Sequence, residues 1–213
     1  LQGRALKGPA HPDKPADPII VHPDVRRMLL TMRAWAQGCR ALATWISTEL
    51  DISTKHPDPQ RRQGADDFVQ LMTPVVKAFC TDVGFESANL GVQVMGGHGY
   101  VSDHGMEQLV RDARIAQIYE GTNGIQALDL VGRKLGAHTG RYLRGFFHPV
   151  QAFIDEHMEH EEVADVITPL AKSFGRLQRA SAHIAESGIN DPDEAAAAAT
   201  DYLRLFGLTA VGY

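Results

Sequence analysis

The sequence contains little cysteine, no basic excess and no long hydrophobic run. Its two cysteines, Cys39 and Cys80, are too few for a disulfide framework, and both occupy apolar positions of helical patterns. This usage predicts a reducing, cytoplasmic compartment. Lysine and arginine total 21 against 26 aspartates and glutamates, which gives a formal net charge of −5. Because nucleic-acid binders normally carry a basic excess or a basic face, the charge balance excludes that partner class.

No segment approaches the roughly eighteen uninterrupted apolar residues of a membrane span, so none is predicted. The sequence also lacks any run with the two-residue alternation of a strand. Apolar residues instead recur three and four apart over residues 24–50 and again over 68–94, which predicts two long amphipathic helices. We expect a loop over residues 53–64, and we expect Pro74 to kink or divide the second helix.

In the rest of the chain, glycines mark the predicted ends of helices and the breaks between them. Three of the four residues Gly96-Gly97-His98-Gly99 are glycine, which predicts the end of the second helix. A shorter helix is expected over 106–117, then a break at Tyr119-Glu120-Gly121, then a helix capped by Thr122. Further helical patterns cover about 142–158, 161–187 and 193–211, the last introduced by Asn190-Asp191-Pro192. The predicted fold class is all-α, an antiparallel helical bundle followed by a smaller C-terminal helical unit.

Three regions are expected along the chain. Five prolines in residues 1–23 predict an extended strap or linker, with Pro23 in the first turn of a helix. Residues 24–138 form the bundle, and residues 139–213 form the additional helical unit. Since the 213 residues begin without Met and stop inside an apolar helical pattern, we expect a piece of a longer protein.

The segment 91–126 carries the chemistry. Glu120 lies in a break between helices, directly before Gly121 and a helix N-terminus whose free N–H groups suit a phosphate. A carboxylate so placed can point into a cavity, where burial would tune it as a base. An ordinary acid near a helix N-terminus is the commoner interpretation of the pattern alone. The glycine cluster lacks the G-x-G-x-x-G spacing of a dinucleotide-binding turn.

Two stretches, QVMGGHGY and RDARIAQIYEGTNGIQ, resemble the C-terminal signature of the flavin-dependent acyl-CoA dehydrogenases. In that family Q-x-x-G-G-x-G-[YF] is followed by R-D-[AS]-[RK] and then by I-Y-E-G-T. The resemblance implies that residues 24–138 are the family's C-terminal four-helix-bundle domain. Residues 139–213 resemble the extra C-terminal helical domain of the longer members, in truncated form. The substrates of those members range from long acyl-CoA to methylthio-propanoyl-CoA.

The resemblance implies a role for each matching residue. Glu120 is similar to the catalytic base that removes the α-proton of the acyl thioester, and Tyr119 and Gly121 would line the thioester pocket. The residues expected near FAD are Gln93, Val94, Gly96, Gly97, Thr122 and Gly124. The first four would contact the ADP part of FAD held by a neighbouring subunit, so the active site would need an oligomer. Gly124 departs from the commoner acidic or amide residue, so its side-chain contact is absent.

The implied function is α,β-dehydrogenation of an acyl-CoA in fatty acid metabolism, with hydride transfer to FAD. The implied partners are an electron-transfer flavoprotein as acceptor and further copies of the chain, as a dimer or tetramer. The family's N-terminal helical domain and middle β-domain are absent, so the isolated chain is expected to be inactive. The alternatives are a non-catalytic helical interaction or oligomerisation module, and an oxidase or a dehydrogenase of a non-fatty acyl-CoA.

Two other clusters have plainer interpretations. His157, His160 and Glu161 resemble an inverted zinc motif, but their acidic neighbours favour a solvated helix face, so no metal is predicted. Arg111 and Arg114 could grip a phosphate or pair with Asp112 or a neighbouring helix.

Overall fold

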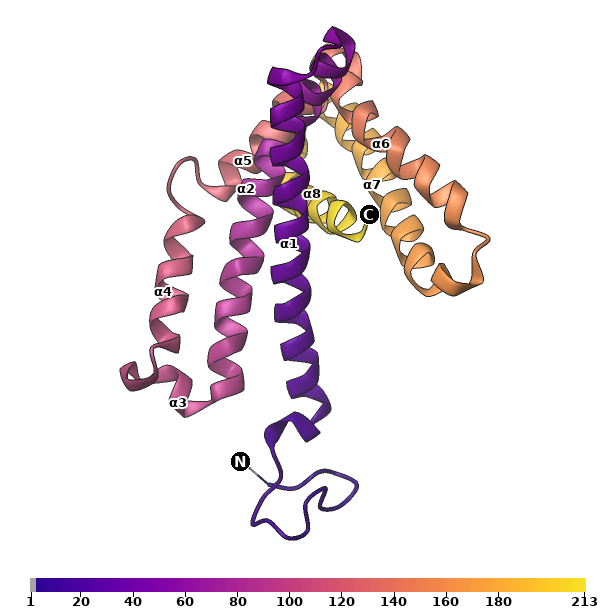
Figure 1. Cartoon of the computed structure of the whole chain (residues 1–213). Coiled ribbons are helices and arrows are strands. Elements are labelled where there is room, and N and C mark those ends of the chain that lie inside the picture. The colour runs from indigo at the N-terminus through magenta and orange to yellow at the C-terminus, as the bar shows by residue number, and fades with distance from the viewer. Residues whose placement is uncertain (1–2) are drawn as a thin grey trace. The chain divides into compact units, whose positions relative to one another are not determined.

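The computed structural model describes residues 3–213, in which an irregular N-terminal segment precedes a series of helices joined by short turns (Figure 1). The helices are α1 (Pro23–Lys55), α2 (Pro59–Met95), α3 (Gly97–Tyr100), α4 (Met106–Ala116), α5 (Asn123–Asp129), α6 (Ala137–His157), α7 (Ala164–Asn190) and α8 (Pro192–Gly212). A π-helical turn, η3 (Leu130–Lys134), continues α5, and 3₁₀ turns lie at Ile19–Val21, Ser102–His104 and Glu161–Val163. No strand occurs among the described residues, which confirms the all-α fold class. None of the helices over residues 3–213 is long and apolar enough to cross a membrane.

The predicted loop over residues 53–64 is wrong. Helix α1 runs to Lys55 and α2 begins at Pro59, so only three residues join them. Proline at the first helical position lacks an N–H that would have no partner there, and the Asp58 carboxylate accepts from the Gln60 amide at 2.9 Å. The prolines therefore start a helix instead of lengthening a loop. Pro74 lies inside α2 without dividing it.

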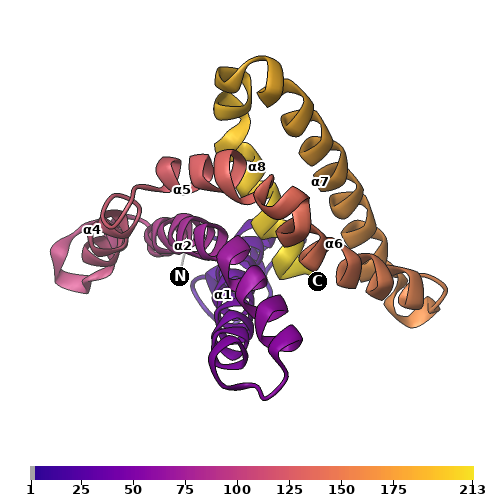
Figure 2. The same ribbon diagram turned by 90° about the horizontal axis from the view of Figure 1, so that it is seen from above.

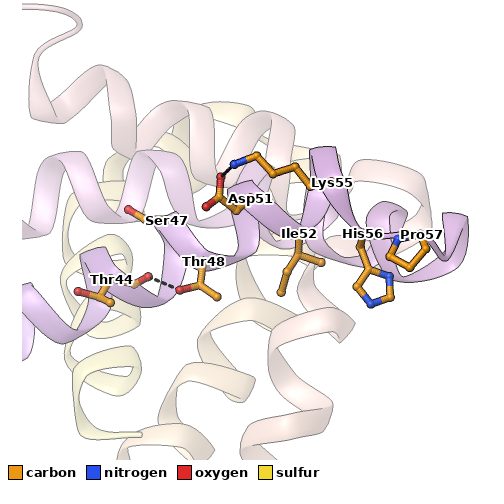
Figure 3. Close-up of a pocket in the computed structure, with 8 residues that line it drawn as sticks. All are labelled: Thr44, Ser47, Thr48, Asp51, Ile52, Lys55, His56 and Pro57. Atoms are coloured by element: carbon orange, nitrogen blue, oxygen red, sulfur yellow. Dashed lines mark hydrogen bonds and ion pairs between the residues drawn. The ribbon is translucent and has the colours of Figure 1, made fainter.

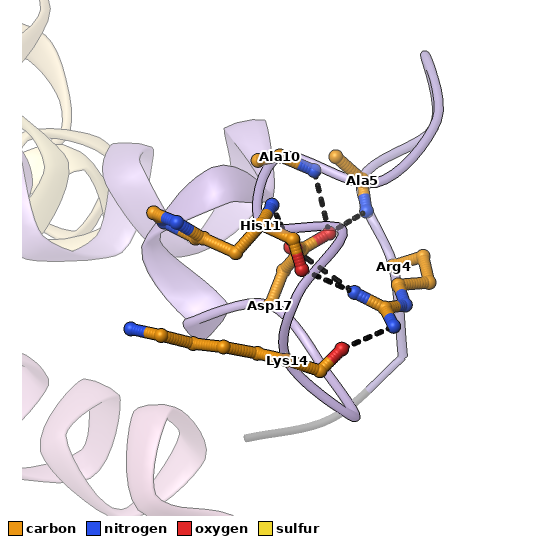
Figure 4. Close-up of polar contacts among 6 residues, drawn as sticks. All are labelled: Arg4, Ala5, Ala10, His11, Lys14 and Asp17. Atoms are coloured by element: carbon orange, nitrogen blue, oxygen red, sulfur yellow. Dashed lines mark hydrogen bonds and ion pairs between the residues drawn. The ribbon is translucent and has the colours of Figure 1, made fainter.

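The N-terminal segment folds back on itself, whereas the sequence predicted an extended strap. Figure 4 shows the Asp17 carboxylate at its centre, accepting backbone N–H groups of Ala5, Ala10 and His11 at 2.8–3.2 Å. The Arg4 guanidinium lies 3.6 Å from the same carboxylate. Because one buried anion satisfies three backbone donors, the prolines around it are held in turns. Helix α1 begins at Pro23, as predicted.

The chain divides into two compact units. The first comprises the described residues up to Gln37 together with Val83–Ala116, and the second comprises Gly38–Asp82 together with Gln117–Tyr213. In the first unit a Cβ on Gly91 of α2 would lie 2.5 Å from the Met106 methyl group at the start of α4. Gly91 therefore permits the close approach of α4 to the end of α2.

The core of the second unit is built on buried aromatic rings. Phe79, Phe146, Phe174 and Phe206 are fully buried, and the rings of Phe146 and Phe206 lie 4.8 Å apart. Helix α8 contacts both α5 and α7 (Figure 2). Burying one such ring stabilises the fold by about 1.5–3 kcal/mol. The Asp191 carboxylate caps α8 by accepting from the Asp193 amide at 3.0 Å, which confirms the predicted start of this helix.

A half-buried ion pair joins α6 to α2 in the second unit. The Arg141 guanidinium donates two hydrogen bonds to the Asp67 carboxylate, at 2.6 and 2.9 Å, and Gln63 donates a third. Just before Arg141 the chain turns sharply, because His138, Thr139 and Gly140 all have positive φ angles. This turn lies at the predicted boundary between residues 24–138 and residues 139–213.

The two cysteines are free thiols on α1 and α2 of the second unit. A hydrogen bond between them lowers the pKa of Cys39 and raises that of Cys80, and burial raises the latter further.

Replacing Asp17 by Asn is expected to open the N-terminal segment. Backbone N–H groups, that of Ala5 foremost, lower the pKa of Asp17 from 3.8 to about 2. The carboxylate therefore stabilises the segment above pH 3.8, and this contribution is lost as the pH falls through about 2. Tryptic cleavage after Lys7 at neutral pH should be faster in Asp17→Asn than in the parent. Asp13→Asn, at an exposed position of the same segment, should cleave at the parental rate.

Replacing Gly207 by Ala is expected to destabilise the second unit. The added Cβ would lie 2.3 Å from Cδ2 of the fully buried Phe79, so α8 must shift away from α2. Overpacking of this kind costs about 1–3 kcal/mol and should lower the urea midpoint. Gly64→Ala in α2 is the matched control, because its Cβ meets nothing within 4 Å and helix propensity favours alanine. Equal midpoints for the two variants would contradict this packing.

Candidate functional site

Residues 118–122, here called the Glu120 loop, form a narrow loop closed at its base. The Asn123 N–H donates to the carbonyl of Gln117 at 3.1 Å, and the Thr122 hydroxyl donates to the same carbonyl at 3.1 Å. Both bonds join the two ends of the loop. Tyr119, Glu120 and Gly121 therefore occupy its tip, which confirms the predicted break between helices.

The backbone of the tip is left-handed at two successive residues. Glu120 has a φ of 51° and Gly121 a φ of 82°. Glycine adopts this region freely, whereas a glutamate held there is uncommon and strained. A Cβ on Gly121 would also lie 2.6 Å from Nε2 of Gln126, so no larger residue fits without movement. The conformation fixes the direction in which the Glu120 side chain leaves the backbone.

Glu120 lies at the surface of the described chain. It is exposed, and Tyr119 beside it is 52% exposed. The sequence predicted a carboxylate that points into a cavity and is tuned by burial. The residues described here do not bury it, so its desolvation requires atoms from elsewhere.

Both ends of the Glu120 loop are tied to α2 by side chains. The Gln117 amide donates to Oδ1 of Asp82 at 2.6 Å, and the Asn123 amide donates to the same oxygen at 2.7 Å. The Lys77 ammonium donates to Oδ1 of Asn123 at 2.7 Å. Sequence reasoning missed these residues. The available signal was a charged residue, Asp82, between the buried Phe79 and Val83 in an apolar helical stripe.

Thr122 occupies the N-cap position of α5, but its side chain does not cap the helix. Its hydroxyl donates to the Gln117 carbonyl. The backbone N–H of Asn123 donates to the same carbonyl, and the backbone N–H of Ile125 donates to the Thr122 carbonyl. The phosphate site predicted at this terminus stays a prediction, with fewer free donors than the sequence implied. A Cβ on Gly124 would meet nothing within 4 Å, so this glycine faces open space.

The second group of predicted site residues lies around a cavity of the first unit. Gln93, Val94 and Gly96 line a cavity of about 630 Å³. The other lining residues are Ile19, His22, Asp24, Val25, Met28, Met95 and His98. Gly97 follows directly in the chain, and neither Gly96 nor Gly97 has an atom within 4 Å of its Cβ position. The end of α2 thus presents bare backbone beside the cavity.

The structure therefore gathers the predicted residues into two groups, one in each compact unit. Tyr119, Glu120, Gly121 and Thr122 share one loop of the second unit, while Gln93, Val94 and Gly96 share a cavity of the first. Arg111, considered as a phosphate ligand or a partner of Asp112, forms an ion pair with Glu107 one helical turn earlier, at 2.9 Å.

A further cavity of about 490 Å³ lies along the end of α1 and contains none of the predicted site residues (Figure 3). Its polar groups are satisfied within the helix. The Thr48 hydroxyl donates to the Thr44 carbonyl at 2.9 Å, and the Lys55 ammonium pairs with Asp51 at 2.7 Å. Nothing in this arrangement indicates chemistry.

The family model described as "Acyl-CoA dehydrogenase, C-terminal domain" matches residues 10–135. The chain belongs to the acyl-CoA dehydrogenase family. A second model, "Acetyl-CoA dehydrogenase C-terminal like", matches residues 146–213. The two matched regions lie on either side of the left-handed turn at His138–Gly140.

Curated acyl-CoA dehydrogenases are similar over nearly the whole chain. The 3-methylmercaptopropionyl-CoA dehydrogenase of Ruegeria pomeroyi is 40% identical over 100% of this chain and 36% of its own length. The broad-specificity linear acyl-CoA dehydrogenase FadE5 of Mycobacterium tuberculosis is 32% identical over 95% of this chain and 31% of its own. The chain therefore spans about a third of the length of these relatives.

A solved structure has the same helical fold. The crystal structure of Caenorhabditis elegans ACDH-11 in complex with C11-CoA matches with a TM-score of 0.71 and 21% identity. The match covers 97% of this chain and 34% of that one. At this identity the likeness shows the helical fold alone.

Replacing Gly96 by Ala is expected to distort the end of α2. Gly96 has φ 61° and ψ −143°, a region that costs a residue with a Cβ about 1–3 kcal/mol. Thermal unfolding of the protein should show a lower midpoint for Gly96→Ala. Gly97→Ala is the matched control, since Gly97 has no positive φ and open space at its Cβ. A parental midpoint for Gly96→Ala would show that α2 does not need this conformation.

Proposed function

We propose that this chain is the C-terminal part of an FAD-dependent acyl-CoA dehydrogenase and carries its catalytic base, Glu120. The observation that carries the proposal is the Glu120 loop, which holds a carboxylate at a strained, left-handed tip with both ends fastened to α2. Backbone strain at a carboxylate is typical of functional sites. Family membership and two relatives named for dehydrogenating acyl-CoA thioesters support the same chemistry.

Glu120 would remove the α-proton of the acyl thioester. This proton is weakly acidic, so the base must be held close to it and partly desolvated. The loop supplies the first requirement. Glu120 is exposed in this chain, so the second would be met by the bound substrate and by the remaining two thirds of the length that the relatives have.

Tyr119 and Gly121 would line the thioester pocket on either side of the base. Gly121 has no side chain, so substrate atoms can approach the backbone beside the carboxylate closely. A backbone N–H at this point would stabilise the enolate-like charge that forms on the thioester oxygen as the proton leaves.

The residues present fit an FAD molecule in part. Gln93, Val94, Gly96 and Gly97 border a cavity with bare glycine backbone, where they would hold the ADP portion of FAD from a neighbouring subunit. Thr122 and Gly124 would lie near the diphosphate or adenosine. Bound FAD would supply the acceptor for the hydride that leaves the β-carbon. This assignment makes the enzyme a homo-oligomer, with an electron-transfer flavoprotein as electron acceptor.

Replacing Glu120 by Gln in the full-length enzyme is expected to stop flavin reduction by acyl-CoA. The amide keeps the size of the side chain and cannot accept the proton, so the rate should fall by about 10³-fold. Anaerobic stopped-flow absorbance of the flavin measures this rate, and the flavin spectrum of the purified enzyme measures FAD content, which should not change.

Glu159→Gln, an exposed glutamate near the end of α6, is the matched control and should reduce flavin at the parental rate. Flavin reduction retained in Glu120→Gln would refute the assignment of the base. A non-catalytic helical module would show no flavin reduction even with Glu120 intact.

A further inference from the structure

The side chain of Asn123 is almost completely engaged by α2. Its Nδ2 donates to Oδ1 of Asp82 at 2.7 Å, to the Thr81 hydroxyl at 2.9 Å and to the Ala78 carbonyl at 3.2 Å. Its Oδ1 accepts from the Lys77 ammonium at 2.7 Å. An asparagine amide has two donor hydrogens and one acceptor oxygen, so little of its capacity is left.

The charges around Asn123 fix which way its amide faces. The oxygen lies against the Lys77 cation and the nitrogen against the Asp82 anion. A flipped amide would set the nitrogen against an ammonium and the oxygen against a carboxylate, and both contacts would be repulsive. Hydrogen bonds to charged partners are also stronger than those between neutral groups. Asn123 is therefore held in a single orientation.

This anchor lies two residues after Gly121 and three after Glu120. The Asn123 backbone N–H closes the Glu120 loop on Gln117, while its side chain and that of Gln117 end on the same oxygen of Asp82. In the tip itself, the Gln126 side chain donates a long hydrogen bond to the Gly121 carbonyl at 3.4 Å. The position of the tip thus depends on its base.

We propose that Asn123, held between Lys77 and Asp82 of α2, is a positioning residue that sets the direction of the Glu120 carboxylate toward the substrate α-carbon. The proposal rests on the proposed function of Glu120. Asn123 itself does not touch the reacting atoms. It acts through the backbone of the loop, in which Glu120 and Gly121 have positive φ angles.

The charge pattern predicts that two different substitutions at Asn123 have similar effects. Asn123→Ala removes the contacts to both charged partners. Asn123→Asp keeps an acceptor for Lys77 but places a second carboxylate oxygen where Nδ2 now lies 2.7 Å from Asp82. Like charges at that distance repel, so the aspartate should be no better than alanine although it is the closest match in shape.

The test measures flavin reduction by saturating acyl-CoA in the full-length enzyme, together with KM and FAD content. Displacing a catalytic group by about 1 Å lowers the rate by up to about 10²-fold. The rate of flavin reduction should therefore fall by about 10–100-fold in both Asn123→Ala and Asn123→Asp. The rate of flavin reduction should change by a larger factor than KM or FAD content, because Asn123 itself contacts neither the substrate nor FAD in the proposed site. Asn190→Ala, an exposed asparagine at the end of α7, should behave as the parent.

Thr81→Val tests the same anchor if the Asn123 variants fail to fold. Valine matches threonine in shape, so the variant should fold, and it lacks the hydroxyl that accepts from the Asn123 amide. It should lower the rate of flavin reduction by severalfold with KM unchanged. A parental rate in Thr81→Val and in every Asn123 variant that folds would overturn the positioning role.

Raised KM or lost FAD with an unchanged rate of reduction would also overturn it, since it would show a merely structural residue. These failures leave Glu120→Gln inactive and the proposed function standing. An active Glu120→Gln enzyme would instead overturn the proposed function and the positioning role together.

Discussion

One carboxylate oxygen on α2 holds both ends of the loop that carries Glu120. Oδ1 of Asp82 accepts from Gln117 before the loop and from Asn123 after it. Half-burial of a carboxylate that accepts hydrogen bonds from two amides costs little free energy, because these charge-assisted bonds replace its hydrogen bonds to water. The short span between the two donors then restricts the tip to a few backbone conformations, of which the observed one is left-handed at Glu120 and Gly121.

A second aspartate near the start of α2 also accepts hydrogen bonds from two side chains. Asp67, buried in the second unit, receives Arg141 from α6 and Gln63 from its own helix. Asp67 and Asp82 of α2 thus bind side chains from segments that follow much later in the chain. Apolar packing, such as Phe79 against Gly207, brings these segments close, and the aspartates select one arrangement among those that packing allows.

The helices could be predicted from the sequence because their signals are local. Apolar residues three and four apart marked α1 and α2, and Asp191 before Pro192 marked the start of α8. Glu120 was also found from the sequence, through the motif that follows Tyr119. The Asp17 network was missed because its partners are six to twelve residues away, where no periodicity reports them.

Lys77 and Asn123 are 46 residues apart, and only the packed fold shows that they meet. Exposure of Glu120 was missed for another reason. A sequence pattern identifies a carboxylate beside a glycine, but it carries no information on which atoms cover it.

The place of Asp82 and Gln117 in the chain has a topological consequence. Asp82 is the last residue of the second unit before the chain enters the first, and Gln117 is the first residue after it returns. The bond between them closes residues 83–116 into a ring. The entropy of such closure grows only with the logarithm of ring length, by about 0.6 kcal/mol for a doubling. The turn between α3 and α4 can therefore change in length while the two ends of the ring, and Glu120 beside them, keep their places.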